Sequence, residues 1–319
     1  KAGRNFKALC PFHAEKKPSF TVSPDKQIFH CFGCGVGGDL FSFVMKKEGI
    51  DFSEALTMLA ERAGVKLEKR GEGERGLKQR ILMANEAATR YFRGELASSG
   101  GREAREYLKK RNLTEATIQR FRIGYAPPQG LLAYLRPLGL SEKELVDWGF
   151  AVEREGKVVD KFRHRIIFPI ADHLGRIVAF TGRALSEEEE PKYLNSPETP
   201  LFVKSQILYG LDLAKEEIQK RDFAILVEGQ MDLLSSYQSG VRNVVAISGT
   251  AFTPEQAQLL RRYTKNLIFA FDNNEAGREA IKRSLPVGSQ AGFKMKVALL
   301  AEKDPDSTIQ KDPALWAKA

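Results

Sequence analysis

The stretch LIFAFDNNEAGREA, residues 267–280, changes character in its middle. Four of its first five residues are apolar and bulky, which predicts a buried β-strand. A polar turn follows at Asp272, Asn273 and Asn274, and a helical pattern begins at Glu275. Open α/β sheets usually place their chemistry at the carboxyl tips of buried strands. The stretch therefore predicts a strand–turn–helix unit of an α/β sheet, with Asp272 in a candidate site.

Three other apolar runs accompany this strand in the last third of the chain. They are FAILV at 223–227, NVVAI at 243–247 and MKVALL at 295–300, and amphipathic segments separate the four runs. Apolar runs that alternate with helical patterns are typical of βαβ units. Residues 222–319 are therefore expected to form an α/β domain around a mostly parallel sheet.

Acidic side chains follow three of these four runs. Glu228 and Asp232 come after the first, Asp272 after the run at 267–271, and Asp304 and Asp306 after the last. Because the carboxyl ends of parallel strands meet at one edge of a sheet, these side chains should converge. Clustered carboxylates need cations, and Mg²⁺ is the hard, oxygen-preferring candidate. Two such ions can stabilise the attacking and leaving oxygens in phosphoryl transfer, so this edge is a candidate metal site.

A second set of metal ligands lies near the N-terminus, with the spacing Cys10-x2-His13-x17-Cys31-x2-Cys34. Each two-residue gap lets both side chains of a pair point at one ion. Four such ligands complete a tetrahedral zinc shell and leave no open position for water. The segment between the pairs alternates like a β-hairpin around a turn at 23–26. The pattern predicts a zinc ribbon that holds one structural zinc ion.

Two questions stay open in this N-terminal segment. His30 competes with His13 as the fourth ligand, although its place beside Cys31 would strain a shared knuckle. Several phenylalanines beside lysines suit stacking on single-stranded bases with phosphate contacts. A small aromatic core under the ribbon explains the phenylalanines equally well. These side chains are Phe20, Phe29, Phe32, Lys16, Lys17 and Lys26.

Composition narrows the class of protein. The 319 residues are 42% hydrophobic and 29% charged, which suits a globular protein with hydrophobic cores. No run approaches the ~18 apolar residues that cross a membrane, and the N-terminus lacks an apolar signal core. The net charge of +9 makes a polyanion such as nucleic acid a plausible partner, although a solvated basic surface has the same composition. Three cysteines, all before residue 35, favour a metal site over a disulfide scaffold.

The pattern divides the chain into parts of different composition. The first contains the zinc ligands and two short helices, one after the N-cap Asp39 and one at 53–63 that stops at Gly64. KRGEGERG at 69–76 has no apolar residue and indicates a flexible linker. Helical patterns follow at 77–97, 102–111 and 114–121, and strand patterns at 165–170 and 176–183. The predicted parts are a zinc-binding domain (1–70), a linker (71–77), a basic N-terminal α/β subdomain of mixed helices and strands (78–221) and a catalytic subdomain (222–319).

Several motifs resemble a known family. EGQMD at 228–232, FDNNEAG at 271–277 and KDPDS at 303–307 resemble the toprim signature, which bacterial-type primases, topoisomerases and some nucleases share. CPFH at 10–13 with HCFGCG at 30–35, FRHRIIFPI at 162–170 and PKYLNSPETPLFVKSQILYGL at 191–211 narrow the choice. Together the motifs resemble the bacterial replicative DNA primase over essentially the whole chain.

The resemblance implies a multi-domain α/β protein in which a zinc-binding domain precedes an RNA polymerase domain with a toprim subdomain. Such an enzyme synthesises short RNA primers on single-stranded DNA from ribonucleoside triphosphates. Its toprim acids bind two or more Mg²⁺ or Mn²⁺ ions. The resemblance also implies a monomer that acts in the bacterial cytoplasm at the replication fork. Contact with the replicative helicase would be made by a C-terminal domain that this chain does not include.

The motifs also carry residue roles. The implied catalytic residues are Glu228, Asp232, Asp272 and Asn274. The implied Mg²⁺ ligands are Glu228, Asp272, Asn274, Asp304 and Asp306, with Glu228 as an alternative base for the primer 3′-hydroxyl. The residues implied to bind nucleic acid or nucleotide are Arg163, Arg165, Arg183, Lys192, Asn195 and Lys204. Ordinary surface charge is the competing interpretation for each of these last residues.

The chain departs from the family pattern at Asn274, where the family has aspartate. Asparagine is nearly isosteric and keeps one ligand oxygen, but it loses the negative charge that attracts Mg²⁺. The departure leaves the catalytic competence of this chain open.

Two other functions compete with priming. A topoisomerase or toprim nuclease would share the acidic edge, but a topoisomerase also needs a nucleophilic tyrosine in a separate DNA-gate domain, for which the chain has no space. A DNA nicking assay separates this alternative. A non-catalytic single-strand-binding or recombination-mediator module is the second alternative, and metal-dependent ribonucleotide incorporation would exclude it.

Overall fold

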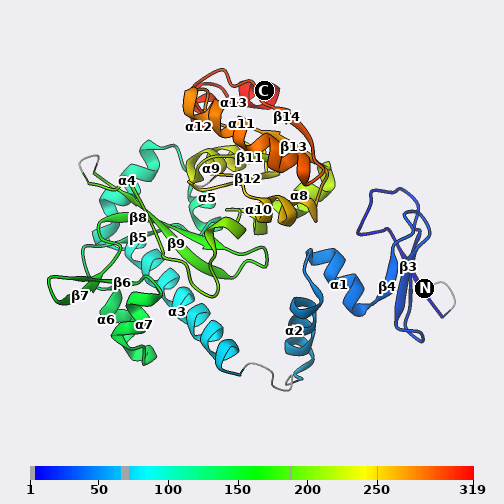
Figure 1. Ribbon diagram of the computed structural model, residues 1–319, viewed down its shortest axis with the longest axis horizontal. Helices are drawn as coiled ribbons and strands as arrows, with labels where there is room; N and C mark the ends of the chain where they lie inside the picture. Colours follow the sequence, from blue (N-terminus) through cyan, green and yellow to red (C-terminus); the bar gives the residue numbers. More distant parts are fainter. Residues whose placement is uncertain (1–3, 66–71, 187–188, 250) are drawn as a thin grey trace. The chain divides into compact units, whose positions relative to one another are not determined.

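The computed structural model describes residues 4–65, 72–186, 189–249 and 251–319. The chain forms two compact units, Lys1–Glu72 and Gly73–Ala319 (Figure 1).

The first unit contains a four-stranded antiparallel sheet. Its strands follow one another in space as they do in the chain, and Gln27 closes the β2–β3 hairpin by donating its backbone N–H to the Pro24 carbonyl. The predicted hairpin between the two ligand pairs is therefore present. The strands are β1 (Phe6–Ala8), β2 (Phe20–Ser23), β3 (Ile28–Cys31) and β4 (Gly37–Asp39).

Two helices complete this unit, with the ends that the sequence predicts. Helix α1 (Leu40–Glu48) begins at the N-cap Asp39, whose carboxylate accepts the Ser42 amide hydrogen. Helix α2 (Phe52–Ala63) begins with a capping box formed by Asp51 and Glu54, and it ends at Gly64 in the left-handed conformation that glycine adopts without strain.

The second unit begins with a long helix, and this corrects the predicted linker. Helix α3 (Glu72–Ala97) already includes residues 72–77 of the linker assigned to 71–77, while 66–71 lie outside the described residues. An ion pair between Glu74 and Lys78 at 2.8 Å spans one helical turn. Once the buried turns around Ile81 are formed, each further residue adds a hydrogen bond at low cost, so the helix continues through two glycines.

Helices and an antiparallel sheet form the first half of this unit. The sheet order is β10-β9-β8-β5, and nearly every residue of β8 and β9 is buried. Both predicted strands of this region are present. The strands are β5 (Gly124–Ala126), β8 (Arg165–Ala171), β9 (Ile177–Ala184) and β10 (Tyr193–Asn195), with a separate hairpin of β6 (Ala151–Arg154) and β7 (Lys157–Asp160). The helices after α3 are α4 (Arg102–Lys110), α5 (Glu115–Arg120), α6 (Leu131–Leu135) and α7 (Glu142–Asp147).

A parallel sheet organises the second half, in the order β12-β11-β13-β14 (Figure 1). All four predicted strands are present, so the expected parallel α/β domain is confirmed. The strands are β11 (Ala224–Val227), β12 (Val244–Ala246), β13 (Asn266–Phe269) and β14 (Lys294–Val297). The helices are α8 (Leu211–Arg221), α9 (Gln230–Gln238), α10 (Pro254–Arg261), α11 (Glu275–Gln290), α12 (Pro305–Lys311) and α13 (Pro313–Lys318).

One hydrophobic core joins the two sheets of the second unit. Ile166 and Phe168 of β8 belong to the same buried cluster as Val227 of β11 and Leu234 of α9. Burial of this much apolar surface fixes the two halves against each other. No helix in the described part of the chain is long and apolar enough to span a bilayer.

Candidate functional site

The four predicted zinc ligands meet at one point of the first unit. The ligand atoms of Cys10, His13, Cys31 and Cys34 all lie within 4.8 Å of one another. The Cys10 and Cys34 sulfurs are 3.9 Å apart, and the Cys31 sulfur is 3.8 Å from His13 Nδ1. Three thiols and one imidazole form a zinc donor set. His30 lies instead on β3 with its ring against Phe32, so the fold selects His13.

Glu15 supports this cluster, and the spacing motif gave no signal for it. Its Oε1 accepts the backbone N–H groups of Cys10 at 2.8 Å and Ser19 at 3.0 Å. Its Oε2 lies 3.3 Å from His13 Nε2, the ring nitrogen that faces away from the sulfurs. A carboxylate behind a ligating histidine fixes the ring orientation and raises the basicity of the ligand. Glu15 therefore orients both knuckle backbone and imidazole.

We expect Glu15→Gln to weaken zinc binding by about 10- to 100-fold, the usual effect of losing such an outer carboxylate. The glutamine oxygen can still accept the two amides, so the fold should persist at saturating zinc. Competition with a zinc chelator measures the change, and Glu61→Gln on an exposed position of α2 is the matched control. Equal zinc affinities in both variants would contradict this role.

The aromatic residues of the ribbon divide between the two interpretations. Phe20 and Phe29 are each 5% exposed, and their rings stack at 5.3 Å in a small core with Phe12 and Phe43. Phe32 is 74% exposed. The core explanation therefore holds for Phe20 and Phe29, and Phe32 is the one of these three predicted residues with the exposure that base stacking requires.

The acidic strand tips of the parallel sheet lie side by side, as expected. Glu228 follows β11 directly, and its Oε1 accepts the Asp272 backbone N–H at 3.0 Å. The Asn273 N–H in turn donates to the Lys303 carbonyl at 2.6 Å, which ties the β13 tip to the segment before α12. Among the described residues, the four zinc ligands are the one group of His, Cys, Asp and Glu side chains that lie close enough to hold a metal ion as they stand. The acidic side chains are instead distributed along the edge of the sheet at which β11, β13 and β14 end.

Two aspartates at this edge have raised pKa values. Burial raises the pKa of Asp272 to about 6, and the charges of Glu228 and Asp304 add to the effect. Burial also raises the pKa of Asp232 to about 7, with contributions from Asp304, Asp272 and Asp306. Burial is the larger cause of both raised pKa values, and repulsion between neighbouring carboxylates is the smaller one. A bound cation would relieve this, so the donor set fits a divalent metal.

Asn274 combines a structural role with contact to this edge. It is the N-cap of α11, and its Oδ1 accepts the Gly277 N–H at 2.9 Å. Its side chain also hydrogen-bonds Asp272, which lowers the pKa of that carboxyl. A β-carbon at Gly277 would lie 2.0 Å from the Asp272 carbonyl oxygen, so glycine is required for this close helix start. The polar turn at 272–274 therefore both starts α11 and contributes side chains to the candidate metal site.

Asp306, a predicted metal ligand, is buried among hydrogen-bond donors of the protein. Its side chain is 4% exposed, and its carboxylate accepts hydrogen bonds from Arg111, Ser235 and Gln310. Oδ1 accepts the bonds from Ser235 and Gln310, and Oδ2 accepts the bond from Arg111. Asp304 is more accessible: one oxygen caps α12 through the Ser307 N–H at 2.6 Å, and the other lies 3.6 Å from Lys303 Nζ. Asp304 is thus the better ligand of the pair.

The structure contradicts the prediction that Arg165 contacts nucleic acid. It is 3% exposed, and its guanidinium donates to the Gly182 and Pro191 carbonyls and to Glu189 at 3.1 Å. It fastens the segment before β10 to the sheet because a buried charge needs this full set of partners. Residues 187–188 of that segment lie outside the described part of the chain.

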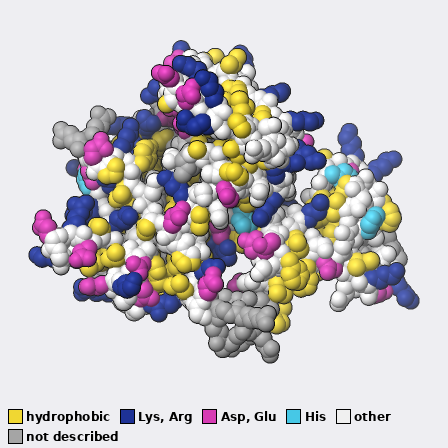
Figure 2. All heavy atoms as spheres, viewed as in Figure 1, with side chains coloured by type: hydrophobic (Ala, Val, Ile, Leu, Met, Phe, Trp, Pro, Cys, Tyr) yellow, Lys and Arg dark blue, Asp and Glu magenta, His cyan; other side chains and the backbone are white. Residues whose placement is uncertain are grey.

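The other predicted basic residues have different surroundings. The Arg183 guanidinium lies 4.5 Å from the Tyr107 ring centre and 5.8 Å from that of Tyr193, which holds it by cation–π contacts. Lys192 is exposed and Arg163 is half-buried. Figure 2 shows basic side chains interspersed with acidic ones over the visible face of the second unit. On this visible face, the basic side chains of the described residues form no separate patch (Figure 2).

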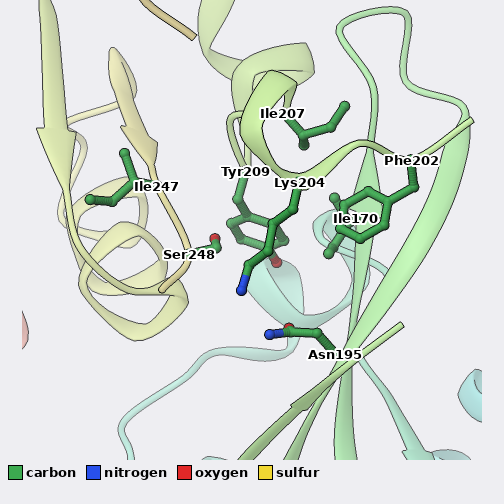
Figure 3. Close-up of a pocket in the computed structure, with 8 residues that line it drawn as sticks. All are labelled: Ile170, Asn195, Phe202, Lys204, Ile207, Tyr209, Ile247 and Ser248. Atoms are coloured by element: carbon green, nitrogen blue, oxygen red, sulfur yellow. The ribbon is translucent and has the colours of Figure 1, made fainter. Parts of the chain in front are cut away.

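Asn195 and Lys204 meet in a pocket between the two sheets of the second unit (Figure 3). Ser248, which follows β12, and Tyr209 complete its polar lining, and sequence reasoning had missed both. The Ser248 Oγ and Tyr209 hydroxyl are buried without a hydrogen-bond partner in the described structure. Ser248 also has a positive φ of 52°. The space beside these hydroxyls has a volume of about 10 Å³, which fits about one water molecule.

Family models match three successive regions of the chain. The CHC2 zinc finger model matches residues 1–75, the DNA primase catalytic core N-terminal domain matches 91–215, and a Toprim-like model matches 225–309. The toprim match includes the acidic edge from Glu228 to Asp306, and the zinc-finger match includes all four ligands.

Named relatives and solved structures agree with these matches. The chain is 43% identical over 98% of its length to a DNA primase of Halalkalibacterium halodurans and 42% identical over 98% to one of Pseudomonas putida. It spans 53% and 49% of these relatives, or about half their length. The crystal structure of the Aquifex aeolicus primase (zinc-binding and RNA polymerase domains) is 40% identical, with a TM-score of 0.70 over 98% of this chain and 77% of that one. A DnaG primase catalytic domain bound to ssDNA is 35% identical, with a TM-score of 0.68 over 74% of this chain and 78% of that one.

Proposed function

The chain belongs to the bacterial DNA primase family, and on that premise we propose that it synthesises short RNA primers on single-stranded DNA from ribonucleoside triphosphates. The observation that carries the proposal is the acidic edge of the parallel sheet. The Glu228 carboxylate accepts the Asp272 backbone N–H there, and the pKa of the Asp272 carboxyl is raised by burial and by neighbouring carboxylates, an effect that a divalent cation would relieve. The zinc-finger unit on the same chain favours a primase over other toprim proteins.

Mg²⁺ or Mn²⁺ ions would be held by Glu228, Asp272 and Asp304, with Asn274 as a weaker oxygen ligand. When bound, such ions supply positive charge that stabilises the attacking and leaving oxygens of nucleotidyl transfer. Asp232 would orient this edge, because its carboxylate accepts the N–H groups of Gly229 at 3.2 Å and Asp306 at 3.2 Å. The bond from Asp306 fixes the start of α12 against α9 at the site.

The pocket between the sheets has a volume of about 10 Å³, room for about one water molecule, so its polar groups would contact an incoming nucleotide only at its edge. Lys204 and Asn195 point into the same space as Ser248 (Figure 3). A lysine amine attracts phosphate, and the amide and hydroxyl groups can donate hydrogen bonds that fix its orientation. Exposed Lys192 and half-buried Arg163 and Arg183 would follow the template backbone.

The zinc ion would be structural, and the exposed Phe32 would stack on template bases. The template and the RNA primer are then macromolecular partners of the site. We include a monomeric state, a cytoplasmic place at the replication fork, and helicase contact through a further domain as parts of this proposal.

A primer-synthesis assay tests the function. The zinc-loaded chain and its Asn274→Asp variant are incubated with single-stranded DNA, labelled ribonucleoside triphosphates and Mg²⁺ or Mn²⁺. We expect short RNA products that require template and metal and that Asp272→Asn abolishes. Nicking of supercoiled DNA without incorporation would favour the nuclease or topoisomerase alternative. DNA binding without either reaction, even in Asn274→Asp, would favour a single-strand-binding module and contradict the proposal.

A further inference from the structure

Arg111 connects the helical half of the second unit to the acidic edge. It follows α4 directly, and its Nη2 donates to Asp306 Oδ2 at 2.5 Å across 195 residues of chain. The other Asp306 oxygen accepts from Ser235 of α9 and Gln310 of α12. One buried carboxylate thus joins the end of α4 to α9 and α12, two of the three helices that follow the acidic strand tips.

The same segment grips α9 at a second point. Gln238, at the end of α9, accepts the Thr114 N–H at 2.8 Å and the Thr117 hydroxyl at 3.1 Å, and it donates to the Asn112 carbonyl at 2.7 Å. Residues 111–117 therefore contact the two helices that carry Asp232 and Asp306. Since these contacts satisfy several hydrogen-bonding groups at once, the segment has one preferred position against the site.

Asp306 is also coupled to the neighbouring acids. Its backbone N–H donates to Asp232 Oδ1 at 3.2 Å, and Asp304 lies two residues before it as the N-cap of the same helix. A fourth free carboxylate here would add both negative charge and an extra ligand to the edge. Arg111 supplies a fixed positive charge to that carboxylate, and a guanidinium keeps its charge at any physiological pH.

We propose that Arg111 is a positioning residue that removes Asp306 from the metal ligand set and anchors α12 so that Asp304 faces the ion. This inference rests on the proposed function, because it assigns a role within the same metal site. It differs from a merely structural ion pair in the sign of its effect on metal binding. Loss of a structural ion pair would loosen the site and lower its affinity for the metal ion. Loss of Arg111 would free a carboxylate and tighten it, because charge and ligand count govern affinity for a hard cation.

Calorimetric titration with Mn²⁺ and melting without added Mn²⁺ test the proposal on the zinc-loaded chain. We expect Arg111→Gln to bind Mn²⁺ about tenfold more tightly, the scale of one nearby unit charge. Its melting temperature should fall by about 5 °C or more, because a buried carboxylate loses its partner. Both tryptophans, Trp148 and Trp316, lie in the second unit, so their fluorescence follows the relevant transition.

A double variant and a matched control identify the cause. Arg111→Gln with Asp306→Asn removes both charges, and it should restore Mn²⁺ affinity to within about threefold of the unmodified chain and recover most of the melting temperature. Arg120→Gln removes the same charge from an exposed position of α5 and should change neither quantity. Primer synthesis at saturating metal should fall in Arg111→Gln despite the tighter binding, because the added ligand misplaces the ion.

A second comparison holds even where Arg111→Gln does not fold. Asp306→Asn should weaken Mn²⁺ binding less than Asp304→Asn does, because only Asp304 is a ligand. Equal weakening by the two, or unchanged or weaker binding in a folded Arg111→Gln, would overturn the proposal. These binding and melting results do not depend on priming, so a chain that makes no primers would refute the proposed function and leave this test intact.

Discussion

Changing Asn274 to aspartate is expected to raise primer synthesis by about two orders of magnitude or more. One electrostatic contact that acts on the transition state supplies roughly 3–4 kcal/mol, which corresponds to this factor. Position 274 touches Asp272 and lies at the start of α11, so a carboxylate there would face the same ion. Because charge count governs affinity for hard cations, Mg²⁺ binding should tighten as well.

Stability without added Mg²⁺ should change in the opposite direction. Aspartate caps a helix as well as asparagine does, so α11 keeps its start. The amide that now hydrogen-bonds Asp272 is lost, and a like charge takes its place beside a carboxyl whose pKa is already raised to about 6. We expect the free energy of unfolding to fall by about 1 kcal/mol, more than the half kcal/mol typical of surface changes.

A neighbouring substitution separates a ligand from a general charge effect. Asn273→Asp adds the same charge at an exposed position one residue earlier, which makes no cap. Its effect on metal affinity and priming should stay below about threefold. Paired Mg²⁺ titrations, melting curves and priming assays measure all three chains. Equal metal affinity and activity in Asn274→Asp and the unmodified chain would mean that position 274 faces no ion.

The second large effect is expected from Cys34→Ser. Among the described residues, the buried cluster of the ribbon consists of Phe20, Phe29 and the ligands Cys10 and Cys31, so the metal must supply much of its stability. Structural zinc contributes about 10–16 kcal/mol of binding free energy in small zinc-finger domains. Loss of one thiolate should release the zinc and unfold the sheet of residues 6–39, while the second unit stays folded.

Zinc content by elemental analysis and tryptophan fluorescence measure the two parts of this expectation. Both tryptophans lie in the second unit, so their melting transition should be unchanged in Cys34→Ser. His30→Ala, which removes the competing histidine, should keep its zinc. Full zinc content in Cys34→Ser, or loss of zinc from His30→Ala, would contradict the ligand assignment.

Local patterns predicted what depends on local physics. Buried strand runs and the polar turn at Asp272 were enough to place the acidic edge, because strand direction alone brings the tips together. The spacing of Cys10 and His13 likewise determined a knuckle. The start of α3 was predicted too late, since the composition of KRGEGERG gives no sign of the packed turns that extend the helix through it.

Partners that are distant in the sequence determine the surroundings of the residues whose contacts the sequence did not predict. Asp306 and Arg165 have the residue types of ligands and phosphate contacts, but each finds buried partners that are distant in the sequence. Arg111 and Ser248 were missed for the same reason. Glu15 has partners within five residues of it and was missed because the ligand spacing gives no signal for a supporting carboxylate. Residue type determines what a side chain can bind, and the fold determines which groups actually contact it.

Metal-dependent RNA synthesis on single-stranded DNA should be compared in the unmodified chain, Asn274→Asp and Asp272→Asn, as Mg²⁺ is titrated. If the acidic edge holds the catalytic ions, Asn274→Asp will be fastest and will need the least Mg²⁺, the unmodified chain will be slower, and Asp272→Asn will make no product at any concentration. Equal rates and equal Mg²⁺ requirements in all three chains would contradict a catalytic metal site at the tips of β11 and β13.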